Sequence, residues 1–323
     1  MRLTFTLAAC AATGALLLAQ DPSLIKIDVD IVSVLTSVRD KRGGLIANLE
    51  KNDFTIYEDG KAQTIKYFSR ETDLPLTIGL LVDVSGSQRN LIETERSAAS
   101  QFFQQVLRPK DQAFLISFGS EAELLQDYTA SSRLLNDGLN RLRPDSAVGG
   151  LHPGPVPTIS QPRGTVLFDA VYLAAAEKLK SEVGRKVIVL ISDGVDMGSR
   201  LSQEKAIEAA QKSDTVIYGI EYSDGGAYGR GFGTISMGGG GGGTLRKLAE
   251  ETGGHSYRVD RGHTLNQIFT ELQEEMRSQY MIGYTPSNDV KDGSYRKLEI
   301  KLAKKDLKAQ ARKGYFAVKP EAQ

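Results

Sequence analysis

One run of seven uncharged residues, Leu76 to Val82, constrains the fold of this chain more than any other segment. The run does not alternate with polar residues, which is typical of a β-strand covered on both faces. It ends in Asp83-Val84-Ser85-Gly86-Ser87, so a buried strand delivers one acid and two hydroxyls to its own carboxyl tip. In open α/β sheets, ligands collect beyond the carboxyl ends of the strands. The sequence therefore predicts a binding site at this tip.

Two later segments carry matching features in the same chain. Residues 163–170 have the sequence Arg-Gly-Thr-Val-Leu-Phe-Asp-Ala, and residues 187–194 have the sequence Val-Ile-Val-Leu-Ile-Ser-Asp-Gly, a second apolar strand that ends in an acid. Alone, Asp-x-Ser-x-Ser also fits a hydroxyl-rich turn that caps the next helix. Together, the three segments resemble the metal-ion-dependent adhesion site of von Willebrand factor type A domains.

This resemblance implies a fold, a metal and a set of ligands. The fold is a doubly wound, Rossmann-like α/β sheet, and the alternation of apolar strands with helical periods after Asp83 agrees with it. The metal is Mg²⁺, with Mn²⁺ or Ca²⁺ as alternatives. Its ligands by resemblance are Asp83, Ser85, Ser87, Thr165 and Asp193. The three hydroxyls are neutral ligands and the two acids act mostly through water or hydrogen bonds, so an Asp or Glu carboxylate from a protein partner is the expected further ligand.

The amino terminus has the features of a secretory signal. Residues 1–19 contain Arg2, an apolar stretch and Leu17-Leu18-Ala19 before a polar continuation. Lipidation at Cys10, which follows Leu7-Ala8-Ala9, is the alternative interpretation. We therefore expect a secreted, periplasmic or envelope protein that has no disulfide after cleavage, since Cys10 is the only cysteine. No later segment is long and apolar enough to span a bilayer.

Charge and motif content limit the other function classes. The chain has 40 basic and 40 acidic residues, so no basic surplus favours nucleic acid. It lacks a Gly-x-Ser-x-Gly elbow, and its three histidines, His152, His255 and His263, are widely separated. We therefore expect a binding module that is not an enzyme. The alternatives are a structural scaffold whose metal braces the loops and, less favoured, a metal-dependent hydrolase.

Both flanks of the α/β region have strand patterns. Residues 20–73 and 277–323 alternate apolar and polar residues around Asp-Gly turns, and neither is large enough to form a core alone. We expect the two flanks to build one sandwich-like β module, with the type A domain, residues 74–276, inserted between them. The motifs Glu58-Asp59-Gly60 and Gly283-Tyr284-Thr285-Pro286 also resemble the flanks of a von Willebrand factor A-related family of secreted acidobacterial proteins.

Two irregular segments interrupt the α/β pattern. Residues 143–164 are rich in proline and lead directly into Thr165, so we expect a semi-rigid rim that takes part in partner recognition. Residues 223–243 are rich in glycine and end in six consecutive glycines, so we expect disorder there. The glycines of this second segment lack the spacing of a dinucleotide-binding fingerprint.

Overall fold

The structure is a computed structural model, and it describes residues 31–70, 74–145, 164–222 and 241–318. The predicted signal, residues 1–19, lies outside the described residues. The same holds for most of the two irregular segments and for the alternating residues that precede Ile31.

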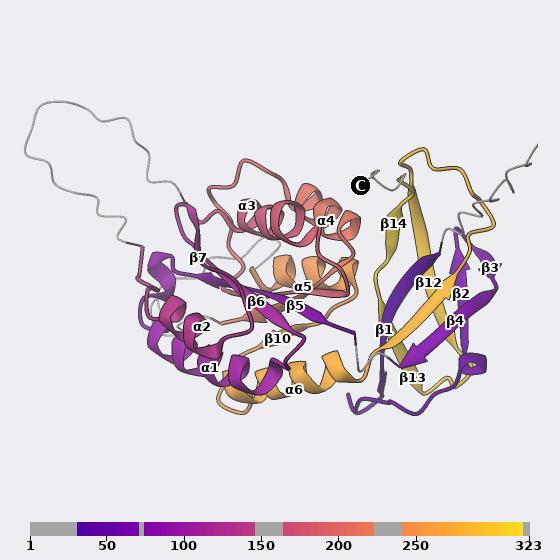
Figure 1. The fold of residues 1–323 in the computed structure, drawn as a ribbon, viewed down its shortest axis with the longest axis horizontal. Coiled ribbons are helices and arrows are strands. Elements are labelled where there is room, and N and C mark those ends of the chain that lie inside the picture. Colours follow the sequence, from indigo (N-terminus) through magenta and orange to yellow (C-terminus); the bar gives the residue numbers. More distant parts are fainter. Residues whose placement is uncertain (1–30, 71–73, 146–163, 223–240, 319–323) are drawn as a thin grey trace, which may run out of the picture. The chain divides into compact units, whose positions relative to one another are not determined.

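A six-stranded sheet forms the centre of the α/β region, in the order β10-β9-β8-β5-β6-β7 (Figure 1). All neighbouring strands are parallel except β7, which pairs antiparallel with β6 at one edge. The strands are β5 Leu76–Asp83, β6 Gln112–Phe118, β7 Ala122–Thr129, β8 Arg185–Ser192, β9 Thr215–Glu221 and β10 Ser256–Arg258. Every residue of β5 and β8 is buried, so the expected doubly wound fold is confirmed.

Helices cover both faces of this sheet. The helices are η2 Gly86–Gln88, α1 Ile92–Val106, α2 Ser132–Leu139, α3 Leu167–Tyr172, η3 Leu173–Leu179, α4 Gln203–Lys212, α5 Gly241–Thr252 and α6 Leu265–Arg277. Apolar residues of α1, α2 and α6 share one core with Ile78 and Leu80 of β5, while α3, α4 and α5 share the other with Leu81. Gly79 stands where a Cβ atom would lie 2.4 Å from the Phe114 ring, which explains a glycine inside this strand.

One helix differs from the sequence expectation and another is irregular. The helix that begins at Leu167 changes from α to π geometry at Leu173. Helix α5 begins at Gly241, inside the glycine run that we expected to be disordered. A Cβ on Gly241 would lie 1.9 Å from the Asp193 carbonyl oxygen, so only glycine allows the start of α5 to pack against the end of β8.

The two flanks form two four-stranded antiparallel sheets, and each sheet takes strands from both flanks. The sheet orders are β13-β1-β11-β4 and β14-β12-β2-β3 (Figure 1). The strands are β1 Val32–Asp40, β2 Phe54–Glu58, β3 Lys61–Gln63, β4 Ile65–Arg70, β11 Tyr280–Tyr284, β12 Tyr295–Leu302, β13 Leu307–Ala311 and β14 Gly314–Phe316, with one 3-10 turn, η1 Lys51–Asp53. The single β module predicted from both flanks is therefore present.

A buried acid joins the two flanks inside this module. Glu58 of β2 is 3% exposed and accepts hydrogen bonds from Tyr284 at 2.6 Å and from Tyr315 at 2.9 Å, both of the carboxyl-terminal flank. Arg296 lies 3.3 Å from the same carboxylate. Around this network, an apolar core combines residues such as Val34 with residues such as Ile282. Neither flank therefore has a complete core without the other.

One arginine joins the two segments by which the chain enters and leaves the α/β region. Arg185 at the start of β8 is 2% exposed and donates to the Met276 carbonyl at the end of α6 and, at 3.4 Å, to the Leu74 carbonyl before β5. Residues Ile31–Gln323 form one compact unit. Among the described residues, no helix has the length and apolar character needed to cross a bilayer.

Candidate metal centre

The predicted site residues lie at the point where the strand order of the central sheet reverses. The chain passes from β5 to β6 on one side and later returns to β8 on the other, so the switch point lies between β5 and β8. Both strands end there, β5 in Asp83 and β8 in Ser192. Open α/β sheets bind ligands at such a position. Two of the three sequence segments are thus adjacent because their strands are hydrogen-bonded neighbours.

Three side-chain oxygens form a continuous chain at this switch point. The Ser85 and Ser87 Oγ atoms are 3.0 Å apart, and Ser87 Oγ donates to Asp193 Oδ2 at 2.7 Å. Ser87 is exposed, while Ser85 and Asp193 are partly exposed. The second Asp193 oxygen accepts the Val195 N–H at 3.0 Å, which fixes the carboxylate. Residues 106 positions apart therefore present their oxygens together at the surface.

Asp83 lies beneath this chain of oxygens rather than in it. Asp83 is the last residue of β5 and has no exposed surface. Its two oxygens accept the Ser85 N–H at 2.9 Å and the Ser192 hydroxyl at 2.6 Å. Asp83 therefore fixes two segments. It holds the serine loop, residues 84–87, through the Ser85 N–H, and it holds the end of β8 through the Ser192 hydroxyl. Sequence reasoning assigned no role to Ser192, although it belongs to the Ser-Asp-Gly motif.

The surroundings of Asp83 favour its protonated form more than water does. Burial raises the pKa of Asp83 to about 6, and the nearby Asp193 charge adds to the rise. The hydrogen bonds from Ser192 and Ser85 act in the opposite direction. A cation near the two carboxylates would stabilise the ionised form, since opposite charges within a few ångströms favour it.

Thr165 is positioned by its backbone. Its carbonyl accepts the Met197 N–H at 3.1 Å and the Gly198 N–H at 3.0 Å. In the described part of the chain, its partly exposed hydroxyl has no hydrogen bond to the serine and aspartate oxygens. Asp169, of the same motif, accepts the Arg200 and Leu201 N–H groups and so anchors the start of α3. The structure brings Ser85, Ser87 and Asp193 into contact, and the ligand role of Thr165 stays a prediction.

Two buried polar residues behind the serine loop were not recognised as unusual from the sequence. Gln88 and Glu95 are both 0% exposed, and all four of their side-chain N and O atoms lack a hydrogen-bond partner among the described residues. Burial, and then the charge of Asp83, raise the pKa of Glu95 to about 9. Glu95 therefore carries a proton in the folded state at neutral pH. The signal in the sequence was its place as the one charge in the apolar period of α1.

Exposed apolar side chains border the oxygens. Val195 is 42% exposed and Met197 is 79% exposed, and both follow Asp193 in the loop that anchors Thr165. This rim offers apolar contact to whatever approaches the oxygens.

The oxygens fit a small, hard cation. Adjacent ligands of an octahedral Mg²⁺ ion with bonds of ~2.1 Å are about 3 Å apart, and the Ser85 to Ser87 separation is 3.0 Å. Hydroxyl and carboxylate oxygens are also the ligand types that Mg²⁺ and Ca²⁺ prefer. The described residues contain no cluster of three His, Cys, Asp or Glu side chains suited to a metal, so the serine hydroxyls are essential to this candidate.

A family model and several solved structures have similarity to parts of this chain. Residues 78–195 match the sequence profile of the von Willebrand factor type A domain. Among solved structures, an aerotolerance-related membrane protein from Bacteroides fragilis is 19% identical, with 63% of this chain and 98% of that chain covered and a TM-score of 0.44. BatB from Bacteroides thetaiotaomicron is also 19% identical, with 63% and 97% covered and a TM-score of 0.43.

A third structure with similarity to the chain comes from the mussel byssus. Proximal thread matrix protein 1, described with a zinc-occupied MIDAS motif, is 16% identical, with 68% of this chain and 49% of that chain covered and a TM-score of 0.47. At these identities and scores, none of the three structures informs the function of this chain. No curated protein matches the sequence at a significant level.

Proposed function

Because residues 78–195 of this chain belong to a von Willebrand factor type A domain, we propose that the protein is a metal-dependent, adhesion-type protein-binding module. The observation that supports this most directly is the chain of exposed oxygens formed by Ser85, Ser87 and Asp193 at the switch point of the sheet. Its resident cation is Mg²⁺, with Mn²⁺ or Ca²⁺ as alternatives. The ligand set is Asp83, Ser85, Ser87, Thr165 and Asp193.

Four of these residues have distinct parts in this proposal. Ser85 and Ser87 provide neutral oxygens, and Asp193 orients Ser87 through their 2.7 Å hydrogen bond. Asp83 positions the Ser85 backbone and the Ser192 hydroxyl from below. When bound, the cation supplies an electrophilic centre that attracts an anionic oxygen.

The partner is a protein that presents an Asp or Glu carboxylate. Few charged ligands leave the cation electrophilic, so a carboxylate from the partner replaces a water and neutralises charge in one contact. Metal binding alone is then weak, and metal and partner each strengthen the binding of the other by the same factor. The proposal includes no nucleic-acid partner and no transmembrane segment in the mature chain.

The proposal also includes the processing and domain layout of the chain. Residues 1–19 are a signal peptide, so the mature protein is secreted, periplasmic or bound to the envelope. The type A domain comprises residues 74–276, and the β module is formed by residues 20–73 and 277–323. Mixed strands within each sheet of the β module support this layout. Amino-terminal sequencing of exported material that begins at Met1, or at a lipid-modified Cys10, would contradict the processing.

Calorimetry on the purified protein tests the metal site. Ser87→Ala removes the exposed central oxygen without touching the buried Asp83, so we expect Mg²⁺ affinity to fall at least tenfold while the melting temperature is kept. Ser97→Ala, on the exposed face of α1, is the matched control and should bind Mg²⁺ like the wild type. Equal Mg²⁺ affinity in all three proteins would show that these oxygens do not hold a cation.

A second experiment separates binding from the two alternatives. Capture of an Asp-containing peptide or an envelope-extract protein should require Mg²⁺ and disappear with chelator. Capture that chelator leaves unchanged favours a scaffold whose metal is only structural. Turnover of hydrolase substrates that depends on Mg²⁺ and is lost in Ser87→Ala would favour the enzymatic alternative.

A further inference from the structure

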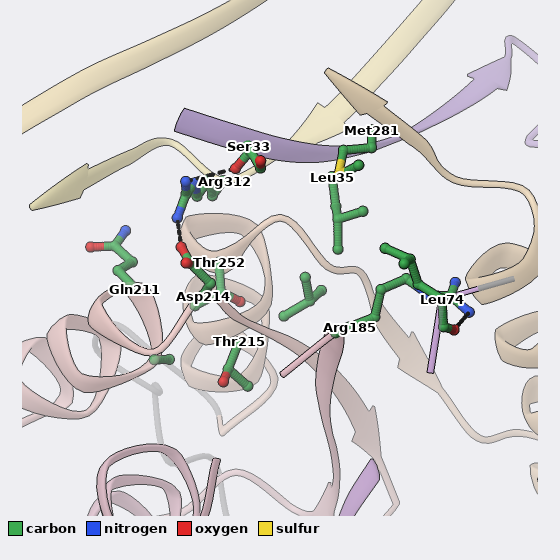
Figure 2. A pocket seen from close by; sticks show the side chains of 13 residues that line it. Ser33, Leu35, Leu74, Arg185, Gln211, Asp214, Thr215, Thr252, Met281 and Arg312 are labelled. Atoms are coloured by element: carbon green, nitrogen blue, oxygen red, sulfur yellow. Dashed lines mark hydrogen bonds and ion pairs between the residues drawn. The ribbon is translucent and has the colours of Figure 1, made fainter. Parts of the chain in front are cut away.

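A cavity of about 310 Å³ lies at the amino ends of β8 and β9 (Figure 2). The candidate metal centre lies at the opposite end of the sheet, where β5 and β8 end. Its walls come from sheet strands β1 and β11 of the β module and from α4, α5, β8 and β9 of the α/β region. This volume is at the lower end of the range for small-molecule sites, enough for one ring system or a short alkyl chain.

One wall of the cavity is apolar. Leu35 of β1 and Met281 of β11 are directly paired across the two strands, so their side chains lie together on one face of the sheet. Figure 2 shows both residues above the cavity, and Val216 and Ala210 line it as well. A ligand of matching shape would bury apolar surface here, and removal of that surface from water favours binding.

The opposite side of the cavity carries a fixed positive group. Arg312 donates to the Ser33 carbonyl at 2.8 Å and to the Asp214 carboxylate, and both contacts appear in Figure 2. Its side chain is 11% exposed, whereas that of Asp214 is 66% exposed, so water weakens the pull of the acid. Arg312 is therefore the lining residue whose charge an acidic head group of a ligand would approach.

Positive charge exceeds negative charge around the cavity. Arg185 and Arg312 line it, and Asp214 is the one acid among its lining residues in the described chain. With two cations against one acid, the lining favours a ligand that carries negative charge.

We propose that this cavity binds a small amphipathic anion, with a carboxylate or a similar acidic group at Arg312 and an apolar body against Leu35 and Met281. Such a ligand contacts the β module and the α/β region at once and therefore braces one against the other. The site is independent of the metal centre and of the function proposed for it.

The test uses the whole protein and two defined probes. The first is 8-anilinonaphthalene-1-sulfonate, an aromatic anion whose fluorescence rises in apolar sites. The chain has no tryptophan, so its own emission interferes little. The second is octanoate, with octanol as its uncharged counterpart. The ¹³C signal of the Met281 methyl group, one of five methionines, reports occupancy directly.

We expect saturable binding of the dye, displacement by octanoate at least ten times more effective than by octanol, and a shift of the Met281 signal. Leu35→Trp fills the cavity and should abolish dye binding, and Arg312→Gln should weaken it about tenfold. Ser33→Trp narrows the cavity from an exposed position of β1 and serves if Leu35→Trp fails to fold. Arg258→Gln, at an arginine 72% exposed in its side chain and outside the lining, is the control and should change nothing.

Three outcomes would overturn the proposal. They are wild-type dye binding in a folded cavity-filling variant, equal displacement by octanoate and octanol, and a Met281 signal that stays unchanged at saturation. Saturable binding that all the cavity variants reduce, and that the control keeps, supports it.

Discussion

Glu275 and Glu95 are both fully buried acids on helices that pack against the same core, yet their surroundings are opposite. Glu275 of α6 accepts hydrogen bonds from Ser37 at 2.9 Å, Arg39 at 2.5 Å, Tyr257 at 3.0 Å and Tyr218 at 3.4 Å. Glu95 of α1 accepts none from the residues that the structure describes. A buried acid with a full set of donors ties elements together, whereas one without donors destabilises the fold.

The positions of the two acids explain the difference. The donors of Glu275 come from β1 of the β module and from β9 and β10, so the acid joins α6 of the α/β region to the amino-terminal flank. Glu95 and Gln88 lie behind the serine loop, and the charge of Asp83 acts on Glu95. A buried acid without donors is unfavourable, and proteins concentrate such unfavourable local structure where they bind ligands. The unsatisfied acid thus lies at the candidate site and the satisfied one at a structural junction.

Among the variants that test this comparison, Glu275→Ala should lower the free energy of unfolding the most. It leaves Arg39, whose side chain is 20% exposed, without its counter-ion, and it removes the acceptor of three hydroxyls. Removing one partner of a buried ion pair costs about 3–5 kcal/mol. Urea unfolding followed by circular dichroism measures this loss, with Glu274→Ala, on the same helix, as control. A loss below about 1 kcal/mol would show that the network does not hold the two regions together.

Asp83→Ala should come next. The Ser192 hydroxyl and the Ser85 N–H both lose their buried acceptor, so we expect a loss of about 2–3 kcal/mol in the free energy of unfolding. Asp83→Asn keeps an acceptor oxygen and should cost less. Chemical denaturation of the two variants side by side decides the matter. If Asp83→Ala has the same free energy of unfolding as the wild type, the hydrogen bonds of Asp83 do not stabilise the fold.

Glu95→Leu should stabilise the protein, by about 1–3 kcal/mol at pH 8, because it removes a buried carboxyl that has no partner. The pKa of Glu95 rises from 4.5 to about 9 on folding, so the folded state holds more protons than the unfolded state between these values. The stability of the wild type should therefore fall as pH rises through this window, and the advantage of Glu95→Leu should grow. Unfolding at pH 5, 7 and 8.5 measures this trend, and a constant advantage would contradict it.

The smallest effect is expected at an exposed ion pair. Lys247 and Glu204 are 2.9 Å apart, with side chains 48% and 68% exposed. Exposed pairs contribute about 0–1 kcal/mol, so Lys247→Ala should change the stability by less than about 0.5 kcal/mol. This variant is the reference for the changes in stability expected in the three variants of buried acids. A loss as large as that of Glu275→Ala would mean that burial does not explain why the variants differ in stability.

The site and the fold were predictable to different degrees. The expected sheet was correct because β5 and β8 are continuous apolar runs, a signal that is local to each strand. Ser87 and Asp193 lie close together because each comes shortly after the end of such a strand. The start of α5 in a glycine run was missed, because it depends on a backbone contact with Asp193 that no local pattern encodes.

The sequence by itself determined the features that short segments encode. These are the buried strands, their acidic ends, the hydroxyls of the serine loop and the alternating flanks. The tertiary structure alone decided which buried polar atoms find partners. Glu95 and Glu275 are both acids within helices, and only the approach of β1, β9 and β10 gives one of them donors. The cavity at Arg312 has the same origin. Hydrogen bonding and packing of such groups depend on residues hundreds of positions away, whereas strand and helix patterns depend on neighbours in the chain.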